Sequence, residues 1–222
     1  MKISKFPKEI NEQLAEEVGW HIGDGSMNFY SNRGKLKGIY QLRGHIDDDR
    51  DHYIKQIKPI FKNLYNIDIS LREMPSTRVF GFQIWSDDLV KFKQELGLPL
   101  GFKIDIKIPQ NFLNSKKIRI AVLRGIFDTD GCVYLERKNN KLYPRMEIGT
   151  ISINLASQLK NIFSELGLRA TTYKSYVGIK NKRDFYKVVI RGEEMFHNFV
   201  DIIKPKNQKH LDKYNRFIQS FK

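Results

Sequence analysis

The chain has 222 residues, of which 41% are hydrophobic, and this is enough for one sizeable core or two smaller ones. No run approaches the roughly 18 consecutive apolar residues that a membrane span needs, and the first residues lack the apolar core of a signal peptide. The single cysteine, Cys132, excludes an internal disulfide framework and a cysteine-rich zinc module. We therefore expect a protein of the cytoplasm or an organelle matrix that does not bind membranes.

The formal net charge is +14, and the basic residues are spread along the whole chain. A folded protein of this composition has a basic surface, which is typical of proteins that bind a polyanion, most often a nucleic acid. The alternative is a solvated surface whose many lysines and glutamates serve stability at high temperature.

The first half of the chain predicts a helix, a hairpin, a second helix, two strands and a short third helix. The first helix is amphipathic, because Ile10, Leu14, Val18 and Ile22 recur every four residues. The expected elements are residues 9–23, 26–30 with 38–46 around a turn at 32–34, 47–65, 67–72, 79–85 and 87–96.

Residues 99–117 have no clear period and contain Pro99, Gly101 and Pro109, so we interpret them as a linker. The same order of elements then restarts and ends in one additional helix. The expected ranges are 118–129, 132–138 with 143–152 around a turn at 139–140, 155–166, 171–177, 185–191, 193–202 and 207–221.

The two halves are related by a constant offset. Three pairs of residues are each separated by 106 positions, namely Asp24 with Asp130, Ile84 with Ile190, and Lys103 with Lys209. We therefore predict a duplicated α+β unit with a four-stranded antiparallel sheet in each copy. The predicted half-domains are residues 1–98 and 118–222.

One helix of each copy ends on a carboxylate followed by glycine. Residues 18–25 read V-G-W-H-I-G-D-G, and residues 123–131 read L-R-G-I-F-D-T-D-G. The carboxyl end of a helix is the negative pole of its dipole, so Asp24 and Asp130 cost about 0.3–1 kcal/mol each there unless something offsets that cost. Ordinary turn chemistry is one explanation, because Asp tolerates unusual backbone angles and Gly supplies positive φ.

Metal binding is the other explanation, and the duplication favours it. Gly19 and Gly125 would let the two helices pack closely, which would bring the two acids together. Two carboxylates at that distance repel unless a cation lies between them, and oxygen ligands alone favour Mg²⁺ or a similar hard divalent ion. Such a site can activate water for phosphodiester hydrolysis.

Residues 123–131 closely resemble the motif of the LAGLIDADG homing endonucleases, and residues 18–25 resemble the weaker first copy found in their single-chain members. Gly19, Asp24 and Gly25 match the motif. The first copy departs from it at Glu17, Trp20, His21, Ile22 and Gly23. The glycine for the helix interface and the terminal acid are therefore kept in both copies.

The resemblance implies an α+β fold in which two pseudo-symmetric αββαββα half-domains form a saddle of two antiparallel sheets on double-stranded DNA. It implies that Asp24 and Asp130 are metal-binding catalytic acids, and that the main-chain carbonyls of Gly23 and Thr129 complete the coordination. The expected metal is Mg²⁺ or another hard divalent cation such as Mn²⁺, or Ca²⁺ in a non-cleaving state.

Three further residues take their interpretation from the same resemblance. Lys103 and Lys209 correspond to the active-site lysines that approach the scissile phosphates, and an ordinary surface role is the alternative on a chain this basic. Asp128 matches the earlier acid of the motif and has Ile22 as its counterpart in the first copy. We interpret Asp128 as structural.

Candidate DNA contacts lie on the predicted strands. Gln41, Arg43 and His45 alternate with Tyr40 and Leu42, so they share a face that can point into a DNA groove. The other basic or amide residues expected there are Arg72, Arg78, Gln83, Arg137, Arg145, Lys174, Lys187 and Arg191. Most of those that touch DNA are expected to touch phosphate.

A run of three acids, Asp47, Asp48 and Asp49, is a competing metal candidate. We interpret it instead as a helix start, where acids cap free N–H groups and suit the positive pole of the dipole. Adjacent side chains of a helix do not converge on one ion. We likewise interpret His21 as a packed histidine rather than a general base.

The sequence therefore predicts a monomeric, metal-dependent homing endonuclease that cuts both DNA strands at a long pseudo-palindromic site, without a protein partner. The alternative is a nucleic-acid-binding protein on the same scaffold, either an intron-splicing maturase that binds RNA or a non-cleaving regulator. An intein-borne nuclease is disfavoured, because the chain has no Cys, Ser or Thr at its start and no His-Asn ending.

Overall fold

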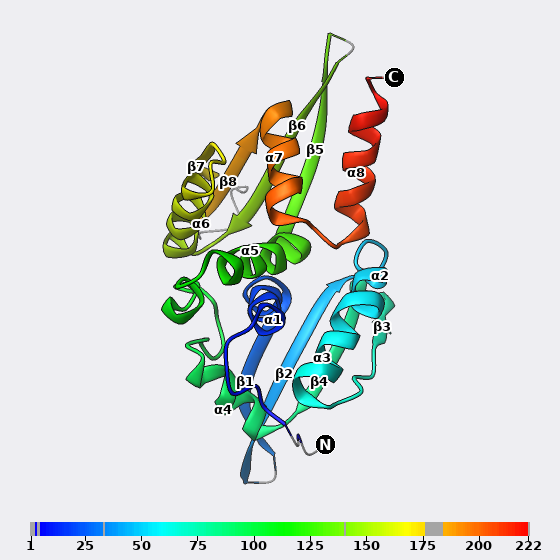
Figure 1. Ribbon diagram of the computed structural model, residues 1–222. Helices are drawn as coiled ribbons and strands as arrows, with labels where there is room; N and C mark the ends of the chain where they lie inside the picture. The colour runs from blue at the N-terminus through cyan, green and yellow to red at the C-terminus, as the bar shows by residue number, and fades with distance from the viewer. Residues whose placement is uncertain (1–2, 4, 33, 140, 176–183, 222) are drawn as a thin grey trace.

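The computed structural model describes residues 3, 5–32, 34–139, 141–175 and 184–221. The chain forms two halves, and helices cover one face of a four-stranded sheet in each (Figure 1). The first half consists of α1 (Glu12–Asp24), β1 (Gly25–Asn32), β2 (Lys35–His45), α2 (Arg50–His52), which continues through a π-helical turn into α3 (Lys58–Tyr65), β3 (Arg72–Met74), β4 (Val79–Trp85) and α4 (Asp87–Glu95). The second half consists of α5 (Lys116–Asp130), β5 (Gly131–Lys138), β6 (Lys141–Thr150), α6 (Ile153–Glu165), β7 (Ala170–Ser175), β8 (Phe185–Arg191), α7 (Glu193–Ile203) and α8 (Gln208–Gln219).

The two sheets have the same antiparallel topology. The strand orders are β1-β2-β4-β3 and β5-β6-β8-β7. Their registers also correspond, because Tyr40 pairs with Ile84 in the first sheet and Met146 pairs with Ile190 in the second, each residue 106 positions further on. The predicted fold class, an α+β protein with two antiparallel sheets, is confirmed.

Helix α1 forms where the sequence pattern predicts it. The side chain of Asn11 accepts a hydrogen bond of 3.0 Å from Leu14 N, which caps the helix start. The apolar face, including Leu14 and Val18, is fully buried. The helix ends without a loop, since Gly25 is already extended at φ −80° and is the first residue of β1. Helix α5 passes into β5 at Gly131 in the same way.

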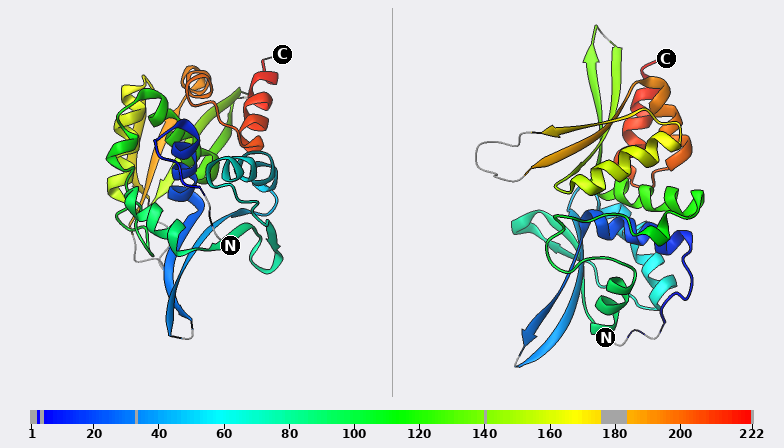
Figure 2. Two further views of the ribbon diagram at one scale, coloured as in Figure 1. Left: turned by 60° about the horizontal axis from the view of Figure 1, so that its bottom comes forward. Right: turned by 90° about the vertical axis from the view of Figure 1, so that its left-hand side faces the viewer.

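Helices α1 and α5 cross at the centre of the molecule, between the two sheets (Figure 2). A methyl group added at Gly19 would lie 2.3 Å from Val122 O, and one added at Gly125 would lie 2.2 Å from Glu16 O. Both contacts are with backbone atoms, which cannot swing aside as a flexible side chain can. The two glycines therefore permit the main chains to touch.

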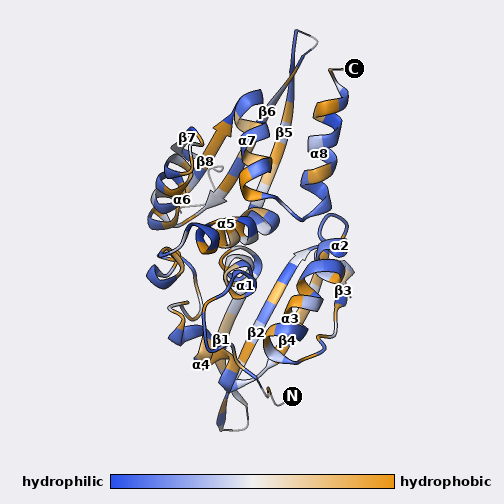
Figure 3. Cartoon of the chain, in the orientation of Figure 1, coloured by the Kyte–Doolittle hydropathy of each residue, from blue (hydrophilic) through white to orange (hydrophobic). Residues whose placement is uncertain are grey.

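Each sheet has one apolar and one polar face, which the alternating colours along β2 show (Figure 3). Tyr40, Leu42 and Phe82 point to the helices and are buried. Gln41 and Arg43 alternate with Tyr40 and Leu42 and so lie on the opposite face, which none of the described helices covers (Figure 2). The long hairpins β1–β2 and β5–β6 extend to opposite ends of the molecule (Figure 1).

The segment between α4 and α5 is packed rather than extended in solvent. Ile106, Ile108 and Phe112 are buried. Ser152 Oγ donates to Ile106 O at 2.7 Å, and Gln158 bonds both main-chain groups of Ile108 at 2.8 and 3.1 Å. The predicted linker therefore lies against α6 of the second half.

The structure differs from the sequence prediction at one strand. Ile67 and Ile69 are buried while Asp68 and Ser70 are exposed, as the alternation predicts. The hydrogen-bonded strand β3, however, begins only at Arg72. Arg33, Asn140 and Val177, which were predicted to lie in two turns and a strand, are outside the described residues. None of the helices in the described ranges has both the length and the apolarity to cross a membrane.

An ion pair is buried inside the first half. Glu17 and Lys93 are both fully buried and bonded to each other. Tyr40 OH donates to Glu17 at 2.8 Å, and Lys93 Nζ donates to Tyr65 OH at 2.7 Å. Burial lowers the pKa of Lys93, and the carboxylate of Glu17 opposes that shift. Glu17, where the first motif copy departs from the family pattern, is thus part of the core of its half.

Gly125→Ala is expected to lower the stability of the protein. In an ordinary helix this substitution stabilises by roughly 0.8–1 kcal/mol, but here the added methyl meets backbone, and overpacking costs typically about 1–3 kcal/mol. The measurement is the free energy of unfolding in urea, with Asn161→Ala on an exposed position of α6 as the control. A more stable Gly125→Ala protein would show that the helices do not depend on this close contact.

Lys93→Met is expected to destabilise the protein by about 3–5 kcal/mol, because it leaves Glu17 charged and buried without its partner. Replacing both residues, in Glu17→Leu/Lys93→Met, should recover part of that loss, because it removes the unpaired charge but leaves the hydroxyls of Tyr40 and Tyr65 without Glu17 as acceptor. Thermal and urea unfolding of the two single variants and the double variant measure this coupling. Additive losses would contradict a shared, mutually compensating pair.

Candidate metal and nucleic-acid site

The structure brings together the two acids that the sequence singled out. Asp24 is the last residue of α1, and Asp130 is the last residue of α5. A methyl group added at Gly23 would lie 2.0 Å from Thr129 Oγ1 and 3.4 Å from Asp130 Cγ, so the two helix ends are in contact. Gly23 and Asp130 both line a cavity between the two sheets, which we call the inter-sheet groove.

The environment of these acids disfavours two negative charges. Burial, together with the charges of Asp130 and Asp49, raises the pKa of Asp24 to about 8. A hydrogen bond of 3.0 Å from Tyr53 OH opposes this shift. Burial also raises the pKa of Asp130, and the charges of Lys103 and Lys209 oppose that shift. The side chain of Asp130 keeps contact with solvent, so its desolvation is incomplete.

Lys103 lies at the carboxyl end of α1. Its ammonium donates to Ile22 O at 2.8 Å, to His21 O at 3.3 Å and to Gly23 O. The last carbonyls of a helix have no partner within the helix, and a cation there interacts favourably with the dipole. Burial lowers the pKa of Lys103, while Asp130 and Asp24 oppose that shift.

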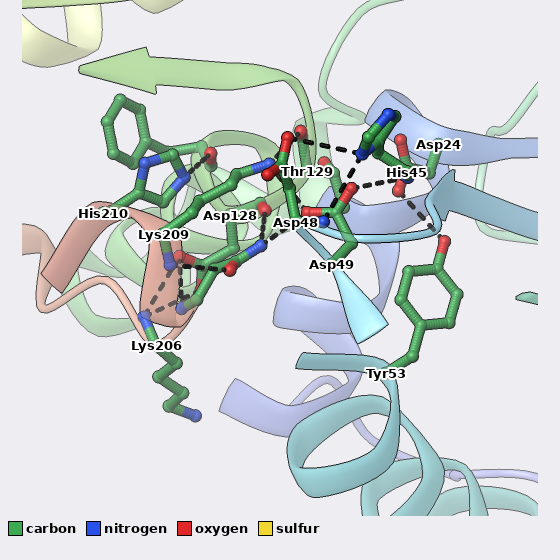
Figure 4. A network of polar contacts seen from close by, with 12 residues as sticks. Asp24, His45, Asp48, Asp49, Tyr53, Asp128, Thr129, Lys206, Lys209 and His210 are labelled. Carbon is green, nitrogen blue, oxygen red and sulfur yellow. Dashed lines mark hydrogen bonds and ion pairs between the residues drawn. The ribbon is translucent and has the colours of Figure 1, made fainter. Parts of the chain in front are cut away.

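Lys209, from the start of α8, occupies the matching position at the end of α5. Its ammonium donates to Thr129 O at 3.2 Å and to Asp49 Oδ1 at 2.8 Å (Figure 4). Each helix that ends on an acid therefore also has a lysine at its last carbonyls. These ammonium groups offset the cost of placing Asp24 and Asp130 at the negative poles.

Asp49 is part of this site although the sequence pattern did not assign it there. It is the N-cap residue of α2, as the helix-start interpretation predicts, but its side chain makes no capping hydrogen bond to that helix, so the predicted capping role of the carboxylate is wrong. It is buried and accepts from His45 N at 2.7 Å and from Asn207 Nδ2 at 2.8 Å, in addition to Lys209 (Figure 4). Asp47, by contrast, is exposed and paired with Arg78.

Asp128 has a structural role. Its carboxylate accepts from Lys206 N at 3.0 Å and from Asn207 N at 3.1 Å, so it fixes the segment that leads into α8. Burial raises the pKa of Asp128 to about 7, and these main-chain bonds oppose the shift. Asp128 thereby places Lys209 indirectly, through the start of its helix.

In the first sheet, most of the residues predicted to contact DNA lie on the open face. Gln41 and Gln83 are directly paired, and Arg43 and Arg72 both pair with Gly81. His45 is on the same face of β2, two residues beyond Arg43. Arg78 is not a strand residue, because it lies in the turn before β4 with φ +53°. This corrects the predicted position of Arg78.

In the second sheet, Arg145, Lys187 and Arg191 lie on the open face together with Glu147. Glu147 is buried and pairs with Arg145 Nε at 3.1 Å and with Lys187 Nζ at 3.0 Å. Two of the predicted contacts are elsewhere. The register places Arg137 opposite Leu142 and Lys174 opposite Tyr186, on the face that the helices cover, and this corrects their predicted orientation.

The donors at the helix ends fit a hard divalent cation with few protein ligands. Among the described residues, no group of three or more His, Cys, Asp or Glu is arranged to hold a metal. The available donors are the carboxylates of Asp24 and Asp130 and the carbonyls of Gly23 and Thr129, which are all oxygens. Mg²⁺ suits such a set, because it usually keeps several water ligands. Burial and the neighbouring carboxylates raise the pKa of Asp24, and a bound cation would favour the ionised form of this acid.

Comparison with known proteins agrees with this geometry. Residues 117–204 match the family model of the LAGLIDADG-like domain. Solved structures with the same fold include the homing endonuclease I-DmoI in complex with DNA and Ca, with a TM-score of 0.62 and 17% identity over 86% of this chain and 88% of that one. The LAGLIDADG meganuclease I-AabMI bound to uncleaved DNA has a TM-score of 0.57 and 14% identity over 91% and 88% of the two chains.

Curated relatives from Methanocaldococcus jannaschii share a segment of similar length. The replication factor C small subunit is 27% identical over 214 residues, which are 95% of this chain and 10% of that protein. The glutamine–fructose-6-phosphate aminotransferase is 24% identical over 221 residues, 98% of this chain and 18% of that protein. The DNA polymerase is 26% identical over 209 residues, 86% of this chain and 12% of that protein. The chain thus spans only a small part of these relatives.

The structure has two repeats of one αββαββα unit, whose first helices cross at glycines and each end on an acid. The family model matches the second of these repeats. Residues 117–204 therefore match a LAGLIDADG-like domain, and the chain as a whole has the two-domain fold of the single-chain LAGLIDADG homing endonucleases.

Proposed function

We propose that the protein is a site-specific, metal-dependent endonuclease that cuts both strands of double-stranded DNA. The observation that carries this proposal is the convergence of Asp24 and Asp130 at the ends of two crossed helices, each with a lysine ammonium at the same helix end. The formal charge of +14 supports a polyanionic substrate. DNA complexes of structural neighbours with the same fold support DNA as that polyanion.

The two open sheet faces suit a long duplex. We propose that residues 1–98 and 118–222 each read one half of an imperfectly symmetric site, and that residues 99–117 connect them. Gln41, Gln83, Arg43, Arg72 and His45 are available to base edges and phosphates in the first half. Arg145, Lys187 and Arg191 are available in the second. Because one chain holds both acids, a single copy can act on both strands.

The roles of the residues at the helix ends follow from their charge and position. Asp24 and Asp130, with the carbonyls of Gly23 and Thr129, would hold Mg²⁺ or a similar ion. When bound, the ion supplies an activated water and stabilises the leaving oxygen of the phosphodiester. Lys103 and Lys209 place a positive charge beside each acid, where they can bind the non-bridging oxygens of a phosphate. The crossed helices fix the two acids, and hydrogen bonds to the last carbonyls of these helices hold the two lysines beside them.

The relatives support a role in the insertion of a mobile genetic segment. Replication factor C, an aminotransferase and a DNA polymerase have unrelated names and activities, yet each contains one stretch that resembles this chain over most of its length. A segment that recurs inside unrelated proteins is the pattern expected of a module that inserts into different genes. We propose that cleavage by this protein opens such an insertion site, as a homing endonuclease does.

Asp24→Asn and Asp130→Asn are each expected to reduce double-strand cleavage by at least about a hundredfold, since each removes one charged oxygen ligand from the reacting centre. The target is recovered first, by sequencing the ends that the parent protein produces in a randomised duplex library. Cleavage of a plasmid with that target and gel-shift binding are then compared, with Asp88→Asn, in the first turn of α4, as the control. Normal cutting by either variant would refute the assignment of its acid.

Removal of divalent ions is expected to separate binding from cleavage. With EDTA, or with Ca²⁺ in place of Mg²⁺, the parent protein should still retard the target duplex and should not linearise the plasmid, because the sheets bind DNA and the helix ends cut it. Mg²⁺ or Mn²⁺ should restore cutting. Cleavage that persists in excess EDTA would overturn the metal dependence, and binding without cutting in every ion would favour a non-cleaving binding protein.

A further inference from the structure

The two lysines of the site occupy equivalent positions in the repeat but have different partners. Lys103 and Lys209 are separated by the repeat offset of 106, and each donates to carbonyls at the end of its own motif helix. Lys103 bonds three carbonyl oxygens of α1. Lys209 bonds one carbonyl of α5, and its second partner is the carboxylate of Asp49, at 2.8 Å.

Asp49 has no acidic counterpart in the second half. The residue 106 positions further on is Leu155, which is buried in the core near the start of α6. Asp49 belongs to the first half and Lys209 to the second, so this ion pair joins the halves across the pseudo-symmetry axis (Figure 4). The site is therefore asymmetric at one of its two lysines.

Asp49 is itself held firmly. Its Oδ2 accepts from His45 N at 2.7 Å, and its Oδ1 accepts from Asn207 Nδ2 at 2.8 Å as well as from Lys209. The same Asn207 side chain donates to Asp128 O at 2.8 Å and accepts from Lys209 N at 3.2 Å. The carboxylate and the lysine are thus tied to one asparagine through separate hydrogen bonds.

Gly44 makes room for this carboxylate beside the metal-binding acid. A methyl group added at Gly44 would lie 2.8 Å from Asp49 Oδ2 and 2.9 Å from Asp24 Oδ2. The same small space on β2 is thus bordered by Asp24, which α1 supplies, and by Asp49, which holds Lys209. Asp49 is close enough to the reacting centre to fix a group there, and its bonds direct it to the lysine.

We propose that Asp49 is a positioning residue that holds the ammonium of Lys209 at the end of α5, and that cleavage of one DNA strand therefore depends on Asp49 while cleavage of the other does not. This rests on the proposed endonuclease function. A lysine side chain has many rotamers, and the ion pair restricts Lys209 to the one that reaches Thr129 O. The hydrogen bonds of Lys103 within the described residues go to carbonyls of α1 and not to Asp49, so removal of Asp49 should affect mainly Lys209.

The first test measures the lysines directly, without DNA. Reductive methylation of each lysine is followed by mass spectrometry in the parent protein, in Asp49→Asn and in Asp51→Asn, which removes an exposed acid two residues away. Asp49→Asn is expected to speed modification of Lys209 by at least about threefold, because the ammonium loses the ion pair that restrains it. Lys103 in the same sample, and both lysines in Asp51→Asn, should keep the parent rate.

Asp49→Glu provides a check on folding and on charge. It keeps a carboxylate that can reach the ammonium, so Lys209 should remain more protected than in Asp49→Asn. Unchanged reactivity of Lys209 in Asp49→Asn, or equal acceleration at Lys103 and Lys209, would overturn the positioning role. The second of these results would indicate a general loosening of the site.

The second test resolves the two strands. Cleavage of the recovered target is followed with the label on each strand in turn. Asp49→Asn is expected to slow cleavage of one strand by about tenfold, the usual effect of removing a residue that supports a reacting group. The rate on the other strand should stay within about twofold of the parent rate. The slowed strand should be the one that Lys209→Met slows most. The double variant Asp49→Asn/Lys209→Met should be no slower than Lys209→Met, because both changes remove one function.

Equal slowing of both strands by Asp49→Asn, or a further loss in the double variant, would refute the inference. The two tests also separate this inference from the function on which it rests. If the parent protein cuts no duplex of the library, the endonuclease proposal fails, and the methylation experiment still decides whether Asp49 holds Lys209.

Discussion

Contact between the main chains of α1 and α5 is the constraint on which the rest of the molecule depends. At Gly19 and Gly125 the two helices touch through backbone atoms, and a single methyl group would separate them. The contact fixes where the two helices end, and therefore where Asp24 and Asp130 lie. Since β1 and β5 begin at the next residues, it also sets the relation between the two sheets.

The charges at the centre are balanced locally, although the chain as a whole is strongly basic. Two acids at negative helix poles are unfavourable, and burial and mutual repulsion raise the pKa of Asp24 to about 8. Lys103 and Lys209 compensate from the same helix ends, through bonds to carbonyls that no helical N–H can reach. The result is a centre in which two carboxylates and two ammonium groups lie at the same pair of helix ends, an arrangement that suits the metal and phosphate of the proposed function.

Local patterns in the sequence predicted the repeated unit, and distant contacts explain what they missed. The offset of 106 between Asp24 and Asp130 recurs in the strand registers, because duplication preserves both. Asp49 was assigned to a helix cap, because its partners Asn207 and Lys209 lie 158 and 160 positions away. Arg137 and Lys174 were placed on the wrong face, because a strand's face depends on its register by a single residue.

No loop separates each motif helix from the strand that follows it, at Gly25 and Gly131. Under the proposed function, a strand that shifted along its DNA half-site to follow a changed base would carry the adjoining acid with it. New target sequences would then be reached most easily by exchanging side chains on β1, β2, β5 and β6 while the backbone stays in place. Changes in specificity would be confined to these side chains, and the spacing of the two acids would be inherited unchanged.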